Sequence, residues 1–495
     1  MKQVSKKQFT SGAFWKIAES FSSKGITMVV SIILARILMP QDYGVIALTT
    51  IFLNLSDILI DGGFSTTLIR KKDVDDCDYS CVLIVSFSMA TLLYIIFFCI
   101  SPLVANYYEE PMFSPVLRVL GLTVFIQAFT ATRTAIVNRN MQFKFSCYCN
   151  IASSIISGVA GIVAAYAGLG VWAIVIQRLL QNALLTIFLF IKVEFKIKWQ
   201  IRINRLKEIV KFSIGVVSAS LLYFVANNMY SAVIGKRYSV TDLGYYSKGN
   251  QLPEQISLYT FSAVSGVLLP TISSYQDDID RVKYIIRKVT AFSTYIIFPL
   301  MIGMMLTSEE LIVLLLTEKW KSAAPVMVGC CIYYIGMPFT LMNSQIYYAL
   351  GHSFMKLKVE IIRFFMMAIG LILGSFILNC NISQLSIIGG CIMLVAAVIS
   401  AYEAGKMLHY TFREMIMDII KPVICTGVMS IAVRLAGTIT DSAGIVGVFI
   451  PLIIKIAIGV TVYIIMSVIL KADGFYEVKN ILFESFKSDH RRNQN

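Results

Sequence analysis

Charged side chains inside long apolar stretches are the residues of this chain best placed to do chemistry. Each stretch is about as long as the 20 residues that cross a hydrocarbon core, and a charge near its centre costs roughly 2.5–3.5 kcal/mol. Such a charge normally faces a hydrated cavity or a polar partner. Basic groups outnumber acidic ones, which indicates an interior that attracts an anionic solute. The basic residues are Lys16, Lys24, Arg36, Arg118, Arg133, Arg178, Arg363, Arg434 and Lys455, and the acidic residues are Glu19, Asp57, Asp61, Glu360 and Glu403.

The first apolar stretch, residues 13–38, carries the most informative polar pattern. On a helical wheel its polar side chains fall on one side, and Arg36 falls on the other. One interpretation is a cavity-lining stripe in which Lys16 and Lys24 bind an anionic group. The alternative is an ion pair between Lys16 and Glu19, with Lys24 extending toward the membrane headgroups. The residues of the stripe are Lys16, Glu19, Ser20, Ser23, Lys24, Thr27 and Ser31.

Polar residues also gather in the fourth, sixth and seventh apolar stretches. Arg133 in the fourth and Arg178 in the sixth are candidates for binding the same anion. The alternatives are a position near the headgroups for Arg133, and hydrogen bonds between helices for the amide side chains around Arg178. The cavity-lining candidates in these three stretches are Gln127, Gln177, Gln181 and Asn227.

Two further sets of charges have more than one interpretation. Arg363 is another candidate for the anion site, but it follows Glu360 by three residues and can equally form an intrahelical ion pair. Asp57 and Asp61 share one face of the second stretch. Together with Glu19 they are candidates for binding a coupling cation, H⁺ or Na⁺. Asp61 directly precedes a pair of glycines, which also favours a simple helix-ending turn there.

The composition argues against enzymes and nucleic-acid-binding proteins. Of 495 residues, 57% are hydrophobic and 15% are charged, and a soluble protein could not cover that much apolar surface. The chain has no glycine-rich nucleotide loop, no zinc-ligand spacing among its 10 cysteines and no nucleophile–base set. We therefore expect no catalysis, no metal and no cofactor. The net charge of +14 suits anionic lipid headgroups better than nucleic acid, which would need a soluble basic face.

Hydropathy predicts an all-α polytopic membrane protein with about 14 transmembrane helices, which places both termini on one side. Lys and Arg crowd the loops on that side, whereas the opposite loops hold only Lys236, Arg237, Lys248, Lys319 and Lys321. Because cytoplasmic loops carry the Lys/Arg excess, we expect an inner-membrane protein with cytoplasmic termini. The predicted spans are 13–38, 44–63, 80–101, 116–137, 147–167, 170–191, 212–234, 253–272, 289–306, 325–349, 359–379, 385–405, 422–437 and 445–470.

The longest polar break in the sequence is a natural boundary between two halves. An internal repeat supports it, because residues 39–44 (MPQDYG) recur as residues 239–244 (SVTDLG), each time just after a span. Matching halves are common in transporters that work by alternating access. The predicted parts are an N-terminal lobe at 1–195, an amphipathic cytoplasmic linker at 196–211, a C-terminal lobe at 212–408, an interfacial helix at 409–421, two spans within 422–470 and a cytoplasmic tail at 471–495.

A series of motifs resembles one family of membrane proteins. The motifs are residues 34–44 (LARILMPQDYG), 61–65 (DGGFS), 138–145 (NRNMQFKF), 168–177 (GLGVWAIVIQ), 261–270 (FSAVSGVLLP), 276–278 (QDD) and 343–351 (NSQIYYALG). In this order they resemble bacterial polysaccharide flippases of the multidrug/oligosaccharidyl-lipid/polysaccharide exporter superfamily. The most similar branch is the lipopolysaccharide and capsule exporters of the colanic acid type. Beyond the last motif the chain agrees with the family only in hydropathy.

The resemblance implies two six-helix lobes plus two C-terminal helices. It implies a flippase for undecaprenyl-pyrophosphate-linked oligosaccharides in surface polysaccharide biosynthesis, with polysaccharide polymerase and export machinery as further partners beside the membrane lipids. The family's cavity is typically cationic, which suits Lys16, Lys24 and Arg178. One alternative is a multidrug exporter of the same superfamily, which would need an acidic cavity. Another is a polysaccharide polymerase, which would display a large external loop.

Overall fold

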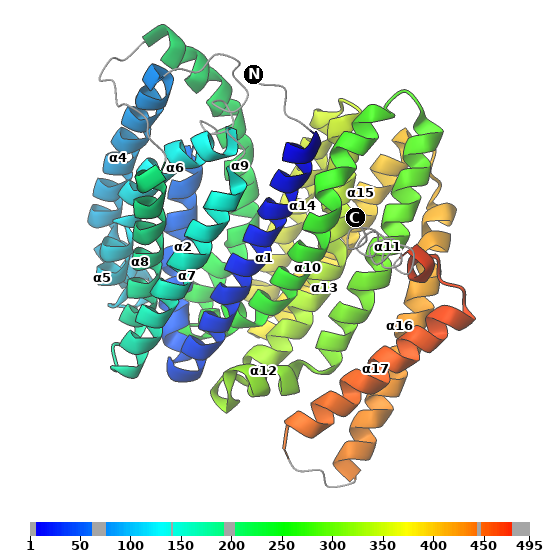
Figure 1. Ribbon diagram of the computed structural model, residues 1–495. Helices are drawn as coiled ribbons and strands as arrows, with labels where there is room; N and C mark the ends of the chain where they lie inside the picture. Colours follow the sequence, from blue (N-terminus) through cyan, green and yellow to red (C-terminus); the bar gives the residue numbers. More distant parts are fainter. Residues whose placement is uncertain (1–5, 62–75, 140–141, 193–202, 443–446, 478–495) are drawn as a thin grey trace, which may run out of the picture. The chain divides into compact units, whose positions relative to one another are not determined.

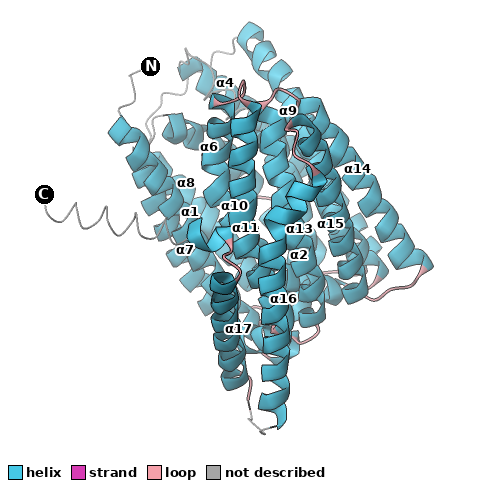
Figure 2. Ribbon diagram, turned by 90° about the vertical axis from the view of Figure 1, so that its right-hand side faces the viewer, coloured by secondary structure: helices cyan, strands magenta, loops and turns pink. Residues whose placement is uncertain are grey.

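The computed structural model describes residues 6–61, 76–139, 142–192, 203–442 and 447–477 (Figure 1). Regular secondary structure in these ranges is entirely helical (Figure 2), which confirms the predicted all-α class. The helices are α1 (Lys6–Ile37), α2 (Pro40–Asp61), α4 (Asp76–Tyr108), α5 (Phe113–Leu120), α6 (Thr123–Arg139), α7 (Phe143–Tyr166), α8 (Val171–Lys192), α9 (Ile203–Arg237), α10 (Val240–Ser274), α11 (Ile279–Leu306), α12 (Ser308–Leu316), α13 (Ala323–Ala349), α14 (Ser353–Ile372), α15 (Ile382–Met407), α16 (Phe412–Ser442) and α17 (Phe449–Ile469).

Most of the predicted spans are apolar helices of membrane-crossing length. The described residues contain 11 such helical segments, from Pro40–Ile60 to Phe449–Ile469, and each coincides with one predicted span. The segment Phe113–Val137 joins α5 and α6 through a short turn at Gly121 and Leu122. The protein is therefore a multi-pass helical membrane protein, while the total of fourteen spans stays a prediction.

The three other predicted spans correspond to α1, α9 and α10. These helices contain 32, 35 and 35 residues, so each is long enough to cross a membrane at about 1.5 Å per residue. Each also contains a polar segment, namely the polar stripe of α1, the Asn227–Asn228 pair of α9 and the Lys248–Gln255 segment of α10. A helix of this kind must direct its polar side away from lipid tails.

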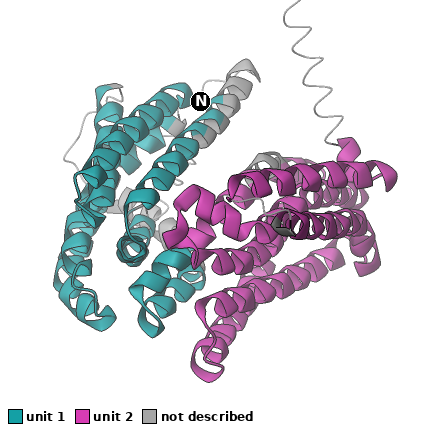
Figure 3. Ribbon diagram, turned by 90° about the horizontal axis from the view of Figure 1, so that it is seen from below, with its two compact units in different colours: residues 1–247 teal, residues 248–495 magenta. Residues whose placement is uncertain are grey.

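The chain divides into two compact units, Met1–Ser247 and Lys248–Asn495 (Figure 3), here called unit 1 and unit 2. The division falls inside α10, after its first two turns. Of the predicted linker at 196–211, residues 196–202 lie outside the described residues, and α9 begins at Ile203. The lobe boundaries proposed from the sequence stay a prediction.

The repeated motif marks two equivalent helix breaks in unit 1. Helix α1 ends at Ile37 and α2 begins at Pro40, and α9 ends at Arg237 and α10 begins at Val240. Both new helices have an aspartate in the first turn that takes part in a capping contact. Asp42 accepts a hydrogen bond from the Met39 backbone N–H at 2.9 Å, and the Asp242 backbone N–H donates to the Ser239 hydroxyl at 3.0 Å. Such caps satisfy orphan donors at a helix start.

Unit 2 is built around α13 and α15, whose backbones approach each other closely. A Cβ added at Gly329 would lie 2.5 Å from the Ile387 backbone nitrogen, and one added at Gly390 would lie 2.7 Å from the Gly329 carbonyl oxygen. Farther along, the Asn343 amide donates to the Ser400 hydroxyl at 3.2 Å. Small residues that let helices approach, with polar bonds between them, are typical of packing inside membranes.

Helix α16 runs without interruption from Phe412 to Ser442. Its first turns contain the stretch that the sequence assigned to an interfacial helix at 409–421. The large apolar side chains of these turns, such as Phe412 and Ile416, are exposed, whereas the acidic side chains bind other helices. The position of this stretch relative to the membrane surface stays a prediction.

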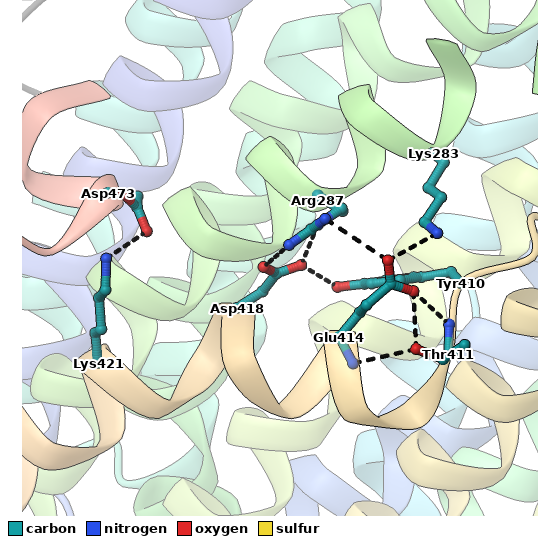
Figure 4. Close-up of polar contacts among 8 residues, drawn as sticks. All are labelled: Lys283, Arg287, Tyr410, Thr411, Glu414, Asp418, Lys421 and Asp473. Carbon is teal, nitrogen blue, oxygen red and sulfur yellow. Dashed lines mark hydrogen bonds and ion pairs between the residues drawn. The ribbon is translucent and has the colours of Figure 1, made fainter. Parts of the chain in front are cut away.

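An ion-pair cluster joins the start of α16 to α11 (Figure 4). The Arg287 guanidinium donates to both carboxylate oxygens of Asp418, at 2.8 and 2.7 Å, and Lys283 pairs with Glu414 at 2.9 Å. The Tyr410 hydroxyl also donates to Asp418, and burial raises the pKa of this phenol, which keeps it protonated. Because a two-point bond between Arg and a carboxylate fixes geometry as well as distance, the cluster sets the register of α16 on α11.

We predict that Gly329→Ala lowers the thermal stability of the purified protein. The added methyl group would meet backbone atoms of α15, which cannot move aside like a flexible side chain, and overpacking of this kind costs about 1–3 kcal/mol. Thermal unfolding in detergent measures the effect. Gly427→Ala is the matched control, because Gly427 has no atom within 4 Å of its added Cβ. Equal melting temperatures of the two variants would contradict the tight α13–α15 contact.

Candidate functional site

The carboxylate of Glu19 lies between α1 and α7. Glu19 is 8% exposed, and its Oε1 accepts hydrogen bonds from the Ser146 hydroxyl at 2.8 Å and the Asn150 amide at 2.7 Å. The sequence predicted an ion pair of Glu19 with Lys16 as one alternative, but the side chain of Lys16 lies outside the described residues. The two donors on α7 were not predicted, although their spacing of four residues in an apolar span was a usable signal.

A second polar contact joins α1, α7 and α8. The hydroxyls of Ser23 and Ser154 lie 3.4 Å apart, and the Gln181 amide donates to Ser154 at 3.3 Å. The structure therefore brings the predicted Ser23 and Gln181 together through Ser154, a residue the sequence analysis did not select. Thr27 instead donates to the carbonyl of its own helix, at Ser23, at 2.9 Å.

Arg178 extends from α8 toward α2. Its Nη1 donates to the Thr50 hydroxyl at 2.8 Å, and Tyr43 and Asp57 lie within electrostatic reach of the guanidinium. The Tyr43 hydroxyl in turn donates to the Ser31 carbonyl of α1 at 3.2 Å. The structure thus gathers a candidate anion-binding cation and a candidate coupling carboxylate, Asp57, in one region of unit 1.

Lys24, Asn227 and Gln127 keep at least part of their side chains accessible. Lys24 and Asn227 are exposed and Gln127 is half-buried. Gln177 is instead buried at the contact between α8 and α7, where a Cβ on Gly161 would lie 2.8 Å from its Cβ. This arrangement indicates a packing role for Gln177.

Arg133 and Arg363 are both buried against partners of their own. The Arg133 guanidinium lies 3.1 Å from the centre of the Phe190 ring, a cation–π contact, and donates to the Phe129 carbonyl at 3.3 Å. Arg363 is 4% exposed and forms the intrahelical pair with Glu360, at 2.8 and 2.7 Å. The alternative that the sequence left open for Arg363 is therefore the observed arrangement.

The Glu360 carboxylate also binds a second cation. Lys356 forms an ion pair with it from one turn earlier, and the Arg363 guanidinium further donates to the Tyr333 hydroxyl at 3.3 Å. Two cations around one carboxylate leave a net charge of +1 in this part of unit 2. Lys356 and Tyr333 were not among the predicted site residues.

The side chains of Ser20 and Asp61 lie outside the described residues, as does that of Lys16. The roles predicted for these three residues remain predictions. The described part of the predicted site falls in unit 1, apart from Arg363.

A family model matches this chain along more than half of its length. The matching residues are 33–325, and the family is described as polysaccharide biosynthesis protein. The chain belongs to this family. The matched range contains both copies of the repeated motif and helices α2 to α12.

Curated relatives carry related names. The chain is 22% identical over 327 residues to the succinoglycan biosynthesis transport protein ExoT of Rhizobium meliloti, and 18% identical over 324 residues to the lipopolysaccharide biosynthesis protein WzxC of Escherichia coli. These alignments cover 66% and 65% of this chain and 66% of each relative, slightly less than two thirds. The teichuronic acid biosynthesis protein TuaB of Bacillus subtilis is 21% identical over 432 residues, or 86% of this chain and 88% of that protein.

Solved structures share the fold. The lipid II flippase MurJ in an inward closed conformation superposes with a TM-score of 0.72 at 18% identity, covering 93% of this chain and 99% of MurJ. An inward-facing multidrug resistance transporter of the MATE family superposes with a TM-score of 0.60 at 14% identity, covering 79% of this chain and 98% of the transporter. At these identities the likeness concerns the fold.

We predict that the Glu19 site tolerates an amide but not an apolar side chain. In Glu19→Gln an amide oxygen remains to accept from Ser146 and Asn150, whereas Glu19→Leu leaves both donors without that acceptor. An unsatisfied buried polar group costs about 1–3 kcal/mol. Thermal unfolding in detergent should therefore rank wild type and Glu19→Gln close together, with Glu19→Leu lower. If Glu19→Leu were as stable as Glu19→Gln, the bonds to α7 would not support the fold.

Proposed function

We propose that the protein is a flippase that moves an undecaprenyl-pyrophosphate-linked oligosaccharide across the cytoplasmic membrane by alternating access. Its family membership and its likeness in fold to MurJ support this proposal. The observation that carries it is the group of polar side chains on α1, α7 and α8, where Glu19 and Ser23 of α1 contact α7 and Arg178 of α8 lies near α2. In the same unit, the exposed Lys24 and the Arg178 guanidinium supply basic groups that suit a hydrated anionic substrate.

The physical need for a protein follows from the substrate. A pyrophosphate and a glycan cannot enter hydrocarbon unaided, because removing water from each polar group costs several kcal/mol. A polar path lined by Ser23, Lys24 and Arg178 would replace that water, while the polyprenyl tail stays in lipid. Transport is then a shift of population between states open to opposite sides, and no bond is made or broken.

The proposal also covers the location of the protein, its partners and the ion that drives transport. The protein would lie in the inner membrane with both termini in the cytoplasm, and would supply a polysaccharide polymerase and export machinery on the other side. Asp57, beside Arg178, is the described carboxylate best placed to couple transport to H⁺ or Na⁺. Lys16, Arg133 and Arg363 remain further candidates for the anion.

A multidrug exporter is the second candidate, because the MATE transporter shares the fold. Exporters of cationic drugs require an acidic path. The excess of basic residues in the apolar stretches favours an anionic substrate instead. Complementation of strains that each lack one polysaccharide flippase, compared with drug-resistance tests of the same cells, separates the two functions and identifies the glycan.

Substitutions of Lys24 test the charge of the path. Lys24→Arg should retain most export, Lys24→Ala should lose part of it, and Lys24→Glu should lose most. At an effective dielectric constant near 20 and a spacing of ~6 Å, the repulsion between a glutamate and the pyrophosphate is roughly 2–3 kcal/mol. Surface polysaccharide per unit of membrane-inserted protein is the measurement. Lys358, which pairs with Glu403 near the end of α15, is the control position. Equal export by the Ala and Glu variants would show that Lys24 does not meet the substrate.

Cysteine labelling tests the orientation. His409→Cys and Arg205→Cys should react only with a permeant maleimide, and Glu318→Cys should react with an impermeant one added to whole cells. Cys99 and Cys391, which are exposed, are first replaced by serine. Labelling of residue 205 or 409 by the impermeant reagent would overturn the predicted topology.

A further inference from the structure

The two copies of the repeated motif contact each other backbone to backbone in unit 1. A Cβ built on Gly44 would lie 1.8 Å from the carbonyl oxygen of Val240, the first residue of α10. A Cβ built on Gly244 would lie 2.0 Å from the carbonyl oxygen of Pro40, the first residue of α2. Both distances are far shorter than any side chain permits, so only glycine fits at either position.

The contact is reciprocal. Each motif supplies the carbonyl of a first helical residue, Pro40 or Val240, and the glycine four residues later, Gly44 or Gly244. Neighbouring positions are buried in the same matched way, with Leu34 and Ile234 in the preceding helices at 1% and 0% exposed. The two related motifs, which share the aspartate and the glycine, therefore form the two halves of one joint.

An exposed ion pair and one hydrogen bond join α4 and α9 beside the joint. Lys236 of α9 pairs with Glu109 at 3.1 Å, with side chains 37% and 82% exposed, and an ion pair so exposed contributes little. The Tyr108 hydroxyl donates to the Ala232 carbonyl at 3.3 Å. At the joint itself, the backbones of α2 and α10 pack directly against each other. Because both side chains of this ion pair are partly exposed, water can solvate them when Lys236 and Glu109 separate.

We propose that Gly44 and Gly244 form a latch that closes the path at the helix ends predicted to be external, and that opens once in each transport cycle. This inference rests on the proposed flippase function. A side chain at either glycine would hold the ends of α2 and α10 apart, so the latch could not close. The separated ends of α2 and α10 would then favour the state open on that side.

Crosslinking measures latch closure without any transport assay. Lys236→Cys and Glu109→Cys are introduced together in a background where Cys99, Cys380 and Cys391 are serine, and a short bis-maleimide with a cleavable disulfide spacer is added to membranes. We expect the crosslink yield to fall about tenfold in Gly44→Ala and in Gly244→Ala, the change in population that ~1.4 kcal/mol produces. Gly427→Ala, with open space around its Cβ, should leave the yield unchanged. An unchanged yield in both motif variants would overturn the latch.

A second measurement keeps the glycines intact, in case the alanine variants do not reach the membrane. The crosslinked Glu109→Cys/Lys236→Cys protein, which retains both motif glycines, should lose surface-polysaccharide export at least about tenfold, and reductive cleavage of the spacer should restore it. Full export by the crosslinked protein would also overturn the proposal. If no strain is complemented at all, the proposed function fails, while the crosslink yields still decide whether the latch exists.

Discussion

Lipid tails offer a polar group no hydrogen-bond partner, so a polar residue inside a membrane span must find its partner within the protein. The described part of unit 1 follows this constraint along α1. Glu19 receives two donors from α7, Ser23 lies against Ser154, and Thr27 donates to its own helix. These bonds hold part of the polar side of α1 against α7, while Lys24 on the same side is exposed.

The two units treat their charges differently. In unit 2 the described charges form compact pairs, such as Arg363 with Glu360 and Arg287 with Asp418. The Arg287–Asp418 pair joins α11 to α16, and the Arg363–Glu360 pair lies within α14. In unit 1 the Arg178 guanidinium donates to the neutral Thr50 hydroxyl. The Asp57 carboxylate also acts on this guanidinium electrostatically.

Close approach of helix backbones at glycine residues occurs in both units. Between α13 and α15 it joins helices along much of their length through Gly329 and Gly390, and there it is supported by buried polar bonds such as Asn343 to Ser400. Between α2 and α10 it is confined to one joint at the helix ends, with exposed polar contacts around it. The two contacts thus share close backbone approach at glycine, but a buried hydrogen bond accompanies one and an exposed ion pair accompanies the other.

The amino-acid sequence alone determined where most of the helices lie along the chain. Runs of apolar residues located 11 helical segments correctly, since the length of a span is a property of local composition. The polar stripe of α1 and the repeat at 39–44 and 239–244 were also readable, because helical periodicity and self-similarity are linear features of a chain.

The partners of the polar residues were decided by tertiary structure. Nothing local indicates that Glu19 meets Ser146 and Asn150, or that Gly44 meets Val240, because these contacts join segments more than a hundred residues apart. For Arg363, sequence and tertiary structure each contributed. The spacing from Glu360 made the ion pair foreseeable, whereas the hydrogen bond to Tyr333 on another helix was not. Charge and helical periodicity in the sequence can identify a candidate site residue. Its role depends on which side chain or backbone atom, often distant in the sequence, lies next to it in the fold.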